Sequence, residues 1–133
     1  MVLSFNQNFP EKIINGTKIH TIHQDTTGRW KAGMKIQFAT GARTEAYNQF
    51  HEAECTGVQD IEIRYTDMRG AVEIYIDGKH LGTWHRFMPP RSVNVADVLR
   101  LAVNDGFEGV TEFLNWFQRD FKGKVIHWTD VRY

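Results

Sequence analysis

Apolar and polar residues alternate along several short stretches of this chain, which is the pattern of half-buried β-strands. Residues Val2–Phe5 alternate near the N-terminus, and Met34, Ile36 and Phe38 alternate with polar neighbours further on. Residues 53–66 carry two more stretches of this kind. Because successive side chains of a strand point to opposite faces, the pattern predicts strands with one face in the core, the first of them at a sheet edge.

A β-hairpin is predicted where two alternating stretches are separated by two turn-forming residues. Val72, Ile74 and Ile76 alternate with polar residues up to Asp77-Gly78. This dipeptide favours the tight turn that joins antiparallel strands. The chain is then expected to return as a strand over residues 79–84, and another strand is predicted over residues 124–128.

Apolar residues three and four positions apart predict two helices in the last third of the chain. Asn94 is the expected cap of the first helix, and Gly109 that of the second. We expect Gly123 to end the second helix. The apolar faces are predicted to hold Val95, Val98, Leu99, Ala102 and Val103 in the first helix, and Val110, Phe113, Leu114, Phe117 and Phe121 in the second.

A short helix is predicted near the N-terminus, with Asn8 as its cap and Glu11 completing a capping box. Gly16 is expected to end it in a left-handed conformation. The chain then extends, and a flat strand would place Thr21 and Lys18 on opposite faces. The two side chains can therefore cooperate only if the lysine lies in the turn that precedes the strand.

The order of these elements predicts the fold class. Strands are grouped and helices are segregated, which is typical of α+β proteins. The 133 residues suggest one domain, spanning residues 1–133. We expect a small, partly closed, mixed or antiparallel β-barrel flanked by helices.

Composition and charge narrow the function classes. A hydrophobic content of 41% fits a globular core, and the single cysteine, Cys55, excludes an intrachain disulfide and is expected to be structural. No apolar run reaches the roughly 20 residues of a membrane span, and no signal peptide is recognised. The expected location is therefore the cytoplasm, with no membrane association.

The formal net charge is zero, which argues against a broad surface for duplex nucleic acid. Charge is unevenly distributed, however, because residues 1–43 hold six basic against two acidic side chains. We expect five of these cations to line one cleft for a small anionic or polar ligand. They are Lys18, Arg29, Lys31, Lys35 and Arg43.

The chemistry most open to interpretation lies in the pattern Gly-x-Lys-x-x-Thr, formed by Gly16, Lys18 and Thr21. An amine beside a hydroxyl is the minimum needed to activate a weak nucleophile. The alternative reading is a helix end followed by an ordinary strand. His20 and His23 point to opposite faces of that strand, so we predict no metal site and no cofactor.

Residues 16–23, Gly-Thr-Lys-Ile-His-Thr-Ile-His, resemble the Gly-x-Lys-x-x-Thr-x-Arg signature of the ASCH domains, which have a PUA-like fold. Asn104-Asp105-Gly106-Phe107, followed by Glu112-Phe113, is also similar to the pattern of that family. The resemblance implies a small barrel with a cleft where the signature meets the acidic turn. The family is regarded as binding RNA or nucleotide-like ligands.

Some small bacterial members of the family remove the acetyl group from N-acetylated cytidine with a lysine, a threonine and an acidic residue. The resemblance carries these roles to Lys18, Thr21 and Asp105. Two positions depart from the pattern: His23 stands where the family has arginine, and Asp105 stands where those hydrolases have glutamate. In this interpretation the lysine takes the threonine proton and the carboxyl group protonates the leaving amine.

Three functions remain open at this stage: a module that binds RNA or a nucleoside or nucleotide, an amidohydrolase, and an accessory domain that binds a protein. The expected ligand-binding residues are Gly16, His23, Arg29, Trp30 and Arg43. Trp30, between two cations, is the predicted stacking platform for a base, and its alternative role is to fill the barrel. Trp116 is expected in the core.

Overall fold

The computed structural model describes residues 1–66 and 70–133. In this part of the chain it contains eight strands, three α-helices and one 3₁₀ turn. The strands are β1 (Val2–Phe5), β2 (His20–His23), β3 (Lys35–Thr40), β4 (Asn48–Glu54), β5 (Gly57–Tyr65), β6 (Ala71–Ile76), β7 (Lys79–His85) and β8 (Phe121–His127). The helices are α1 (Pro10–Ile14), α2 (Val95–Asn104) and α3 (Val110–Trp116), with the turn η1 at Pro89–Arg91.

The strands form two sheets, so the α+β class predicted from the sequence is confirmed. One sheet has the order β1-β3-β4 and the other the order β2-β8-β5-β6-β7. The pairing of β1 with β3 is parallel, whereas the other ladders are antiparallel. As predicted, Val2–Phe5 is an edge strand. None of the helices in the described residues is long and apolar enough to cross a lipid bilayer.

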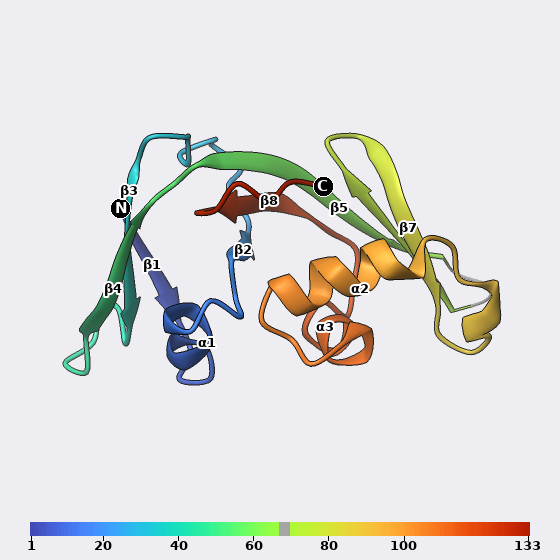
Figure 1. Ribbon diagram of the computed structural model, residues 1–133, viewed down its shortest axis with the longest axis horizontal. Coiled ribbons are helices and arrows are strands. Elements are labelled where there is room, and N and C mark those ends of the chain that lie inside the picture. Colours follow the sequence, from blue (N-terminus) through green and yellow to red (C-terminus); the bar gives the residue numbers. More distant parts are fainter. Residues whose placement is uncertain (67–69) are drawn as a thin grey trace.

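The two sheets are connected by a continuous extended stretch of chain. The Cys55 N–H donates to the Met34 carbonyl at 2.7 Å, and the Thr56 N–H donates to the His127 carbonyl at 2.9 Å. Figure 1 shows β4 and β5 as one long curved ribbon, with the three helices beneath its arch. This curvature places β1 and β2, the edge strands of the two sheets, on the same side of the molecule as α1.

The alternation of apolar residues gave the strand faces correctly. Ile36 and Phe38 of β3 are fully buried, as are Ile63 and Ile74 in the larger sheet. The turn between β6 and β7 has the predicted hairpin geometry, since Asp77 and Gly78 have φ values of 51° and 78°. Positive φ at both residues is the backbone of a type I′ turn, which matches the twist of the strands.

Helix caps were predicted with mixed success. The residue before α1 is Phe9, and not Asn8, whose N–H instead bonds to the Asn6 side chain. Asn94 does precede α2, but with a φ of 53° its amide donates to the Leu81 carbonyl and does not cap the helix. Gly109 precedes α3, as predicted. The Asn94 side chain is therefore held by another strand, while α1 begins one residue later than the predicted cap allows.

The buried face of α2 differs from the predicted one. Val98 and Ala102 are buried as expected, but the third buried residue is Leu101, while Leu99 and its neighbours on the same side are exposed. Gly82 of β7 accounts for this orientation, because a Cβ atom there would lie 2.6 Å from Val98. The absence of a side chain at this glycine lets β7 approach the helix closely.

The second predicted C-terminal helix is shorter than expected. It ends at Trp116, and Phe121 and Gly123 belong to β8. A Cβ atom at Gly123 would lie 2.5 Å from the His23 carbonyl on the neighbouring strand. The glycine therefore permits a close strand contact and does not end a helix. Strand β4 was also missed, since its residues alternate little in burial.

Candidate functional site

A cavity of about 420 Å³ lies between the edges of the two sheets and the helices. Its volume falls within the range of small-molecule binding sites. The walls come from β1, the start of α1, the chain up to and through β2, the turn after α2, the end of α3 and the start of β8. The lining residues are Ser4, Phe5, Asn6, Phe9, Lys18, Thr21, Ile22, His23, Gln24, Asp105, Phe107, Trp116, Phe117 and Phe121.

Lys18 reaches the cavity because it lies in the turn that precedes β2. Gly16 ends α1 with a φ of 82°. The Lys18 N–H then donates to the Lys12 carbonyl, and the Ile19 N–H donates to the Asn104 carbonyl, both at 2.9 Å. These two bonds tie the segment to α1 and to the end of α2. Lys18 and Thr21 therefore face the same space, which a flat strand would forbid.

A buried ion pair joins Lys18 to Asp105. The lysine Nζ lies 2.6 Å from the Asp105 carbonyl oxygen and 3.2 Å from its Oδ1. The two side chains are only 2% and 4% exposed. The Phe9 ring centre lies 4.7 Å from the same nitrogen, which adds a cation–π contact. Because both charges are removed from water, each needs the other to offset its cost of desolvation.

Burial lowers the pKa of Lys18, although the negative charge and the hydrogen bond of Asp105 oppose this change. Desolvation disfavours the ammonium form. An amine with a lowered pKa loses its proton more readily near neutral pH. Lys18 is therefore suited both to holding a polar ligand group and to accepting a proton from a hydroxyl.

Thr21 presents a hydroxyl to the same cavity. It lies in β2, where its backbone is opposite Ile126 of β8, and it is 4% exposed. Within residues 1–66 and 70–133, no protein group forms a hydrogen bond with this hydroxyl, and that includes Lys18. The hydroxyl is therefore free to bond to water or a ligand in the cavity.

His23 also lines the cavity, and its ring lies 6.4 Å from that of Phe5. Burial lowers the pKa of His23, and the nearby charge of Lys18 lowers it further. A neutral imidazole offers one donor and one acceptor. It therefore presents hydrogen-bonding groups without the fixed positive charge of an arginine.

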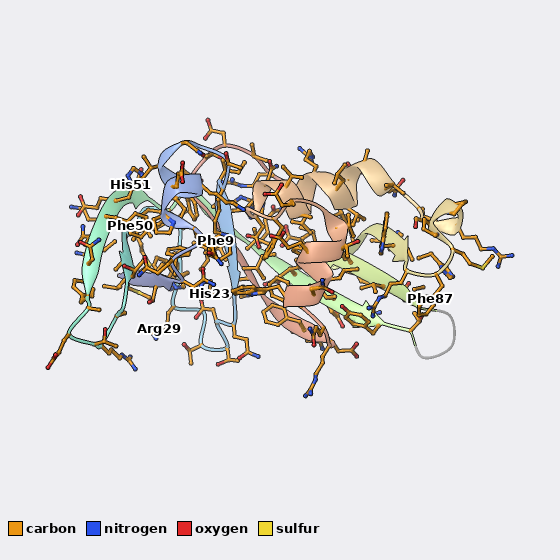
Figure 2. The ribbon with its side chains drawn as sticks, turned by 90° about the horizontal axis from the view of Figure 1, so that it is seen from below. Phe9, His23, Arg29, Phe50, His51 and Phe87 are labelled. Carbon is orange, nitrogen blue, oxygen red and sulfur yellow. The ribbon has the colours of Figure 1, made fainter. Side chains whose placement is uncertain are left out.

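Aromatic side chains form the opposite wall. The rings of Phe9, Phe107 and Trp116 contact one another with centre-to-centre distances of 5.7–5.9 Å. Trp116 is 53% exposed, so it lies at the mouth of the cavity and not in the core as predicted. Figure 2 shows Phe9 and His23 near the middle of the molecule, where α1 faces β2, with Arg29 toward the rim. Flat apolar faces at an open cavity suit an aromatic ligand.

The structure therefore brings together Lys18, Thr21, His23 and Asp105. Gly16 shapes the approach to the cavity without lining it. Of the five cations expected in one cleft, only Lys18 lines this cavity. The others are Arg29, Lys31, Lys35 and Arg43, which are exposed.

Trp30 lies in the interior of the protein and does not form an exposed stacking platform. It is 8% exposed and belongs to the hydrophobic core. The backbone N–H groups of Arg29 and Trp30 both donate to the carboxylate of Asp25 at 2.9 Å, which fixes the loop before β3. The Trp30 side chain is therefore not available at the surface. The tryptophan that lines the cavity and is exposed is Trp116.

The buried groups behind Asp105 were not predicted from the sequence. His20 lies 3.1 Å from its Oδ1, and the other ring nitrogen of His20 lies 2.5 Å from the Tyr133 hydroxyl. A histidine in an apolar strand beside the Gly-x-Lys-x-x-Thr pattern was an available signal. The partner 113 positions away was not, because only the fold brings it close. In the part of the chain that the structure describes, no three His, Cys, Asp or Glu side chains are arranged to hold a metal ion.

Comparisons with known proteins were made at the level of family models, curated sequences and solved structures. None of the three found a match to this chain.

Proposed function

We propose that this protein is an ASCH-type domain whose cavity binds a nucleoside, or a nucleotide of single-stranded RNA. One observation carries the proposal: Lys18, Thr21 and Asp105, from distant parts of the chain, line one aromatic-walled cavity. These are the residues to which the sequence resemblance assigns the ligand chemistry. A site of this kind combines an apolar wall with a few convergent polar groups.

The proposal includes a PUA-like barrel as the scaffold. The continuous chain through Cys55 and Thr56 bends one sheet into the other, which supports this interpretation. Rings from β1 and β3 pack together, with the centres of Phe5 and Phe38 5.8 Å apart. In this scaffold α1 and α3 flank the barrel, and the cavity lies between barrel and helices.

The ligand chemistry follows from the walls of the cavity. Trp116 and Phe107 offer faces on which a base can stack, a contact that contributes roughly 1–3 kcal/mol per base. Thr21 and Asp105 offer polar atoms for the edge of that base. Because the net charge is zero, a single nucleoside or a short single strand is favoured over a long duplex.

A second function, hydrolysis of an N-acylated nucleoside, is favoured by a buried lysine and a hydroxyl that line the same cavity, the hydroxyl having no hydrogen-bond partner among the described residues. The Thr21 oxygen attacks the amide carbonyl carbon, and its proton passes to the neutral amine of Lys18. The C–N bond then breaks, and the leaving nitrogen takes that proton by way of the Asp105 carboxylate. Water cleaves the threonine ester, which releases acetate and restores the hydroxyl.

Binding is tested by titrating the protein with cytidine, N-acetylcytidine and a short single-stranded RNA while following tryptophan fluorescence and heat. We expect saturable binding that is lost in Lys18→Ala and Thr21→Ala. Arg29→Ala is the matched control, since this exposed cation does not line the cavity. Equal affinity in all four proteins would contradict the proposed site.

Hydrolysis is tested by measuring acetate released from N-acetylcytidine. Turnover by wild type and by Arg29→Ala, but not by Lys18→Ala or Thr21→Ala, would establish the enzyme. Saturable binding of the nucleoside without acetate release would leave the binding module. If the wild-type protein neither binds nor hydrolyses any of these probes, the proposal is refuted.

A further inference from the structure

A chain of hydrogen bonds leads away from the cavity through His20. Oδ1 of Asp105 lies 3.1 Å from Nδ1 of His20, and Nε2 of His20 lies 2.5 Å from the Tyr133 hydroxyl. That hydroxyl also accepts a hydrogen bond from the side-chain amide of Asn104 at 3.0 Å. His20 is completely buried and does not line the cavity. It therefore acts on a ligand only through Asp105.

The Asp105 carboxylate and the Asn104 amide set the direction of the bonds in this chain. A carboxylate oxygen only accepts, so Nδ1 of His20 is the donor there. The Asn104 nitrogen only donates, so the Tyr133 oxygen accepts from it and directs its own proton to His20 Nε2. Burial lowers the pKa of His20, which keeps the ring neutral with a single N–H. With Nε2 accepting, that proton is on Nδ1 and is donated to Asp105.

Tyr133 is held firmly at the far end of the chain. Its N–H donates to Oε1 of Gln59 at 3.1 Å, and its carbonyl accepts from Nε2 of the same side chain at 2.9 Å. The Arg100 guanidinium lies 4.8 Å from the centre of the tyrosine ring. The hydroxyl therefore has a fixed position from which to orient the imidazole.

The two carboxylate oxygens of Asp105 have different surroundings. Oδ1 receives both Lys18 Nζ and His20 Nδ1. Oδ2 has no hydrogen-bond partner among the residues that the structure describes, and the side chain lines the cavity. An acceptor left open at a cavity wall is the atom that a ligand N–H can reach.

We propose that His20 is a positioning residue of this site: it holds Oδ1 of Asp105 and thereby leaves Oδ2 for a ligand N–H. Tyr133 and Asn104 set its tautomer. The ligand group is an exocyclic amine of a base or the nitrogen of an acylated amine. This inference rests on the proposed function, because it assigns the polar contact of the same cavity.

Without His20, only Lys18 would hold the carboxylate. The carboxylate would then be free to turn, and Oδ2 could move toward the ammonium group. The ligand would lose its acceptor even though Lys18 and Asp105 were both present. A variant that keeps a donor at the position of Nδ1 should avoid this loss.

The test compares His20→Leu with His20→Asn, whose amide nitrogen replaces Nδ1–H. Loss of a hydrogen bond to a charged group reduces affinity by roughly tenfold or more. We expect that loss for cytidine in the leucine variant and near wild-type affinity in the asparagine variant. If N-acetylcytidine is hydrolysed, its KM should rise by a similar factor in the leucine variant and stay near the wild-type value in the asparagine variant. Equal behaviour of the two variants would overturn the positioning role.

Circular dichroism melting shows which variants are folded, and His80→Asn, at an exposed histidine, is the matched control. Nitrogen-15 NMR of the ligand-free protein provides a readout that needs no activity. We expect the His20 proton on Nδ1, and a shifted Nε2 resonance in Tyr133→Phe. A proton on Nε2 would overturn the hydrogen-bond chain.

The two levels of the proposal can fail separately. Absence of both binding and turnover in wild type would refute the proposed function, and with it the ligand-facing role of Oδ2. The tautomer of His20 in the same sample would still decide whether Tyr133 and Asn104 orient it. Binding by wild type with no difference between the leucine and asparagine variants would overturn only the role of His20.

Discussion

Two hollows of this protein have the same volume, about 420 Å³ each, but their charged side chains differ in exposure to water. The inner one is the candidate site around Lys18 and Asp105. The outer one lies against β5, β6 and β8, and is lined by residues such as Asp60, Tyr75 and Lys124. Size alone therefore does not distinguish the two hollows.

The difference lies in how far the charges are removed from water. In the outer hollow Lys124 pairs with Asp60, but their side chains are 29% and 65% exposed. In the inner one the lysine and the aspartate are 2% and 4% exposed. Solvent screens the first pair, whereas the second interacts through a medium of low polarity. Burial lowers the pKa of the lysine in the inner pair.

The strongest test of this comparison is Lys18→Met. We expect the free energy of unfolding to fall by about 3–5 kcal/mol, because Asp105 becomes a buried charge without its cationic partner. Urea denaturation measures the change. The double variant Lys18→Met/Asp105→Leu should recover much of the stability. No loss in the single variant would show that the pair is more hydrated than its burial indicates.

Acidification should also lower the free energy of unfolding, because a buried histidine resists protonation. Burial, followed by the nearby His20 and Arg132, lowers the pKa of His127 from 6.5 to about 3. Between these values the unfolded chain binds a proton that the folded protein excludes. Stability is therefore lost as the pH falls through this window, by at most about 1.4 kcal/mol per pH unit for this group.

Urea denaturation at several pH values between 7 and 4 measures this dependence. The slope should be shallower in His127→Gln, which cannot titrate, and unchanged in His80→Gln at an exposed position. The same slope in all three proteins would contradict the assignment to His127.

Two glycines with left-handed backbones allow a finer comparison. Gly106 has a φ of 97°, and a Cβ atom there would lie 3.1 Å from Lys18 Cδ. Gly78, at the outer hollow, has a φ of 78° with nothing within 4 Å. Gly106→Ala should cost about 2 kcal/mol of unfolding free energy, and Gly78→Ala about 1 kcal/mol from strain alone.

Thermal or urea unfolding measures both losses, and titration with cytidine distinguishes them further. Only Gly106→Ala should weaken binding, since it displaces the lysine. Equal stabilities and equal affinities in the two variants would show that the lysine adjusts freely around the added methyl group.

The smallest effect is expected for Lys124→Met in the outer hollow. An exposed ion pair contributes about 0–1 kcal/mol, so the unfolding free energy should stay within that range of wild type and lose its dependence on salt. Denaturation at low and high salt checks this. A loss as large as that of Lys18→Met would remove the distinction between the two hollows.

Local pattern predicted much of the fold because each of these features is decided by neighbours in the chain. The Asp77-Gly78 turn, the left-handed Gly16 and the buried faces of β3 and β6 all follow from a few adjacent residues. The orientation of α2 did not, since it depends on Gly82 of another strand. Gly123 was misread for the same reason: its close contact is with β2.

The site was predicted in part. The resemblance, and not the periodicity, pointed to Lys18, Thr21 and Asp105 together. Tyr133 and His20 could not be paired from sequence, because neither has a local signal for the other. The preferred positions of Trp30 and Trp116 were wrong, because Trp30 is buried and Trp116 is exposed. Adjacent cations indicate an exposed aromatic only if the loop turns outward, and bonds to Asp25 hold this loop in another conformation.

The pairing of Lys18 with Asp105 spans 87 positions of the chain, and this separation has a consequence for biogenesis. During synthesis the amine emerges long before its carboxylate, and until the C-terminal third has docked it is an ordinary hydrated surface group. Contacts between such distant residues form late because a long loop must first be closed. The proposed binding therefore requires the C-terminal part of the chain to have folded, and a nascent or partly unfolded molecule lacks the paired lysine and aspartate.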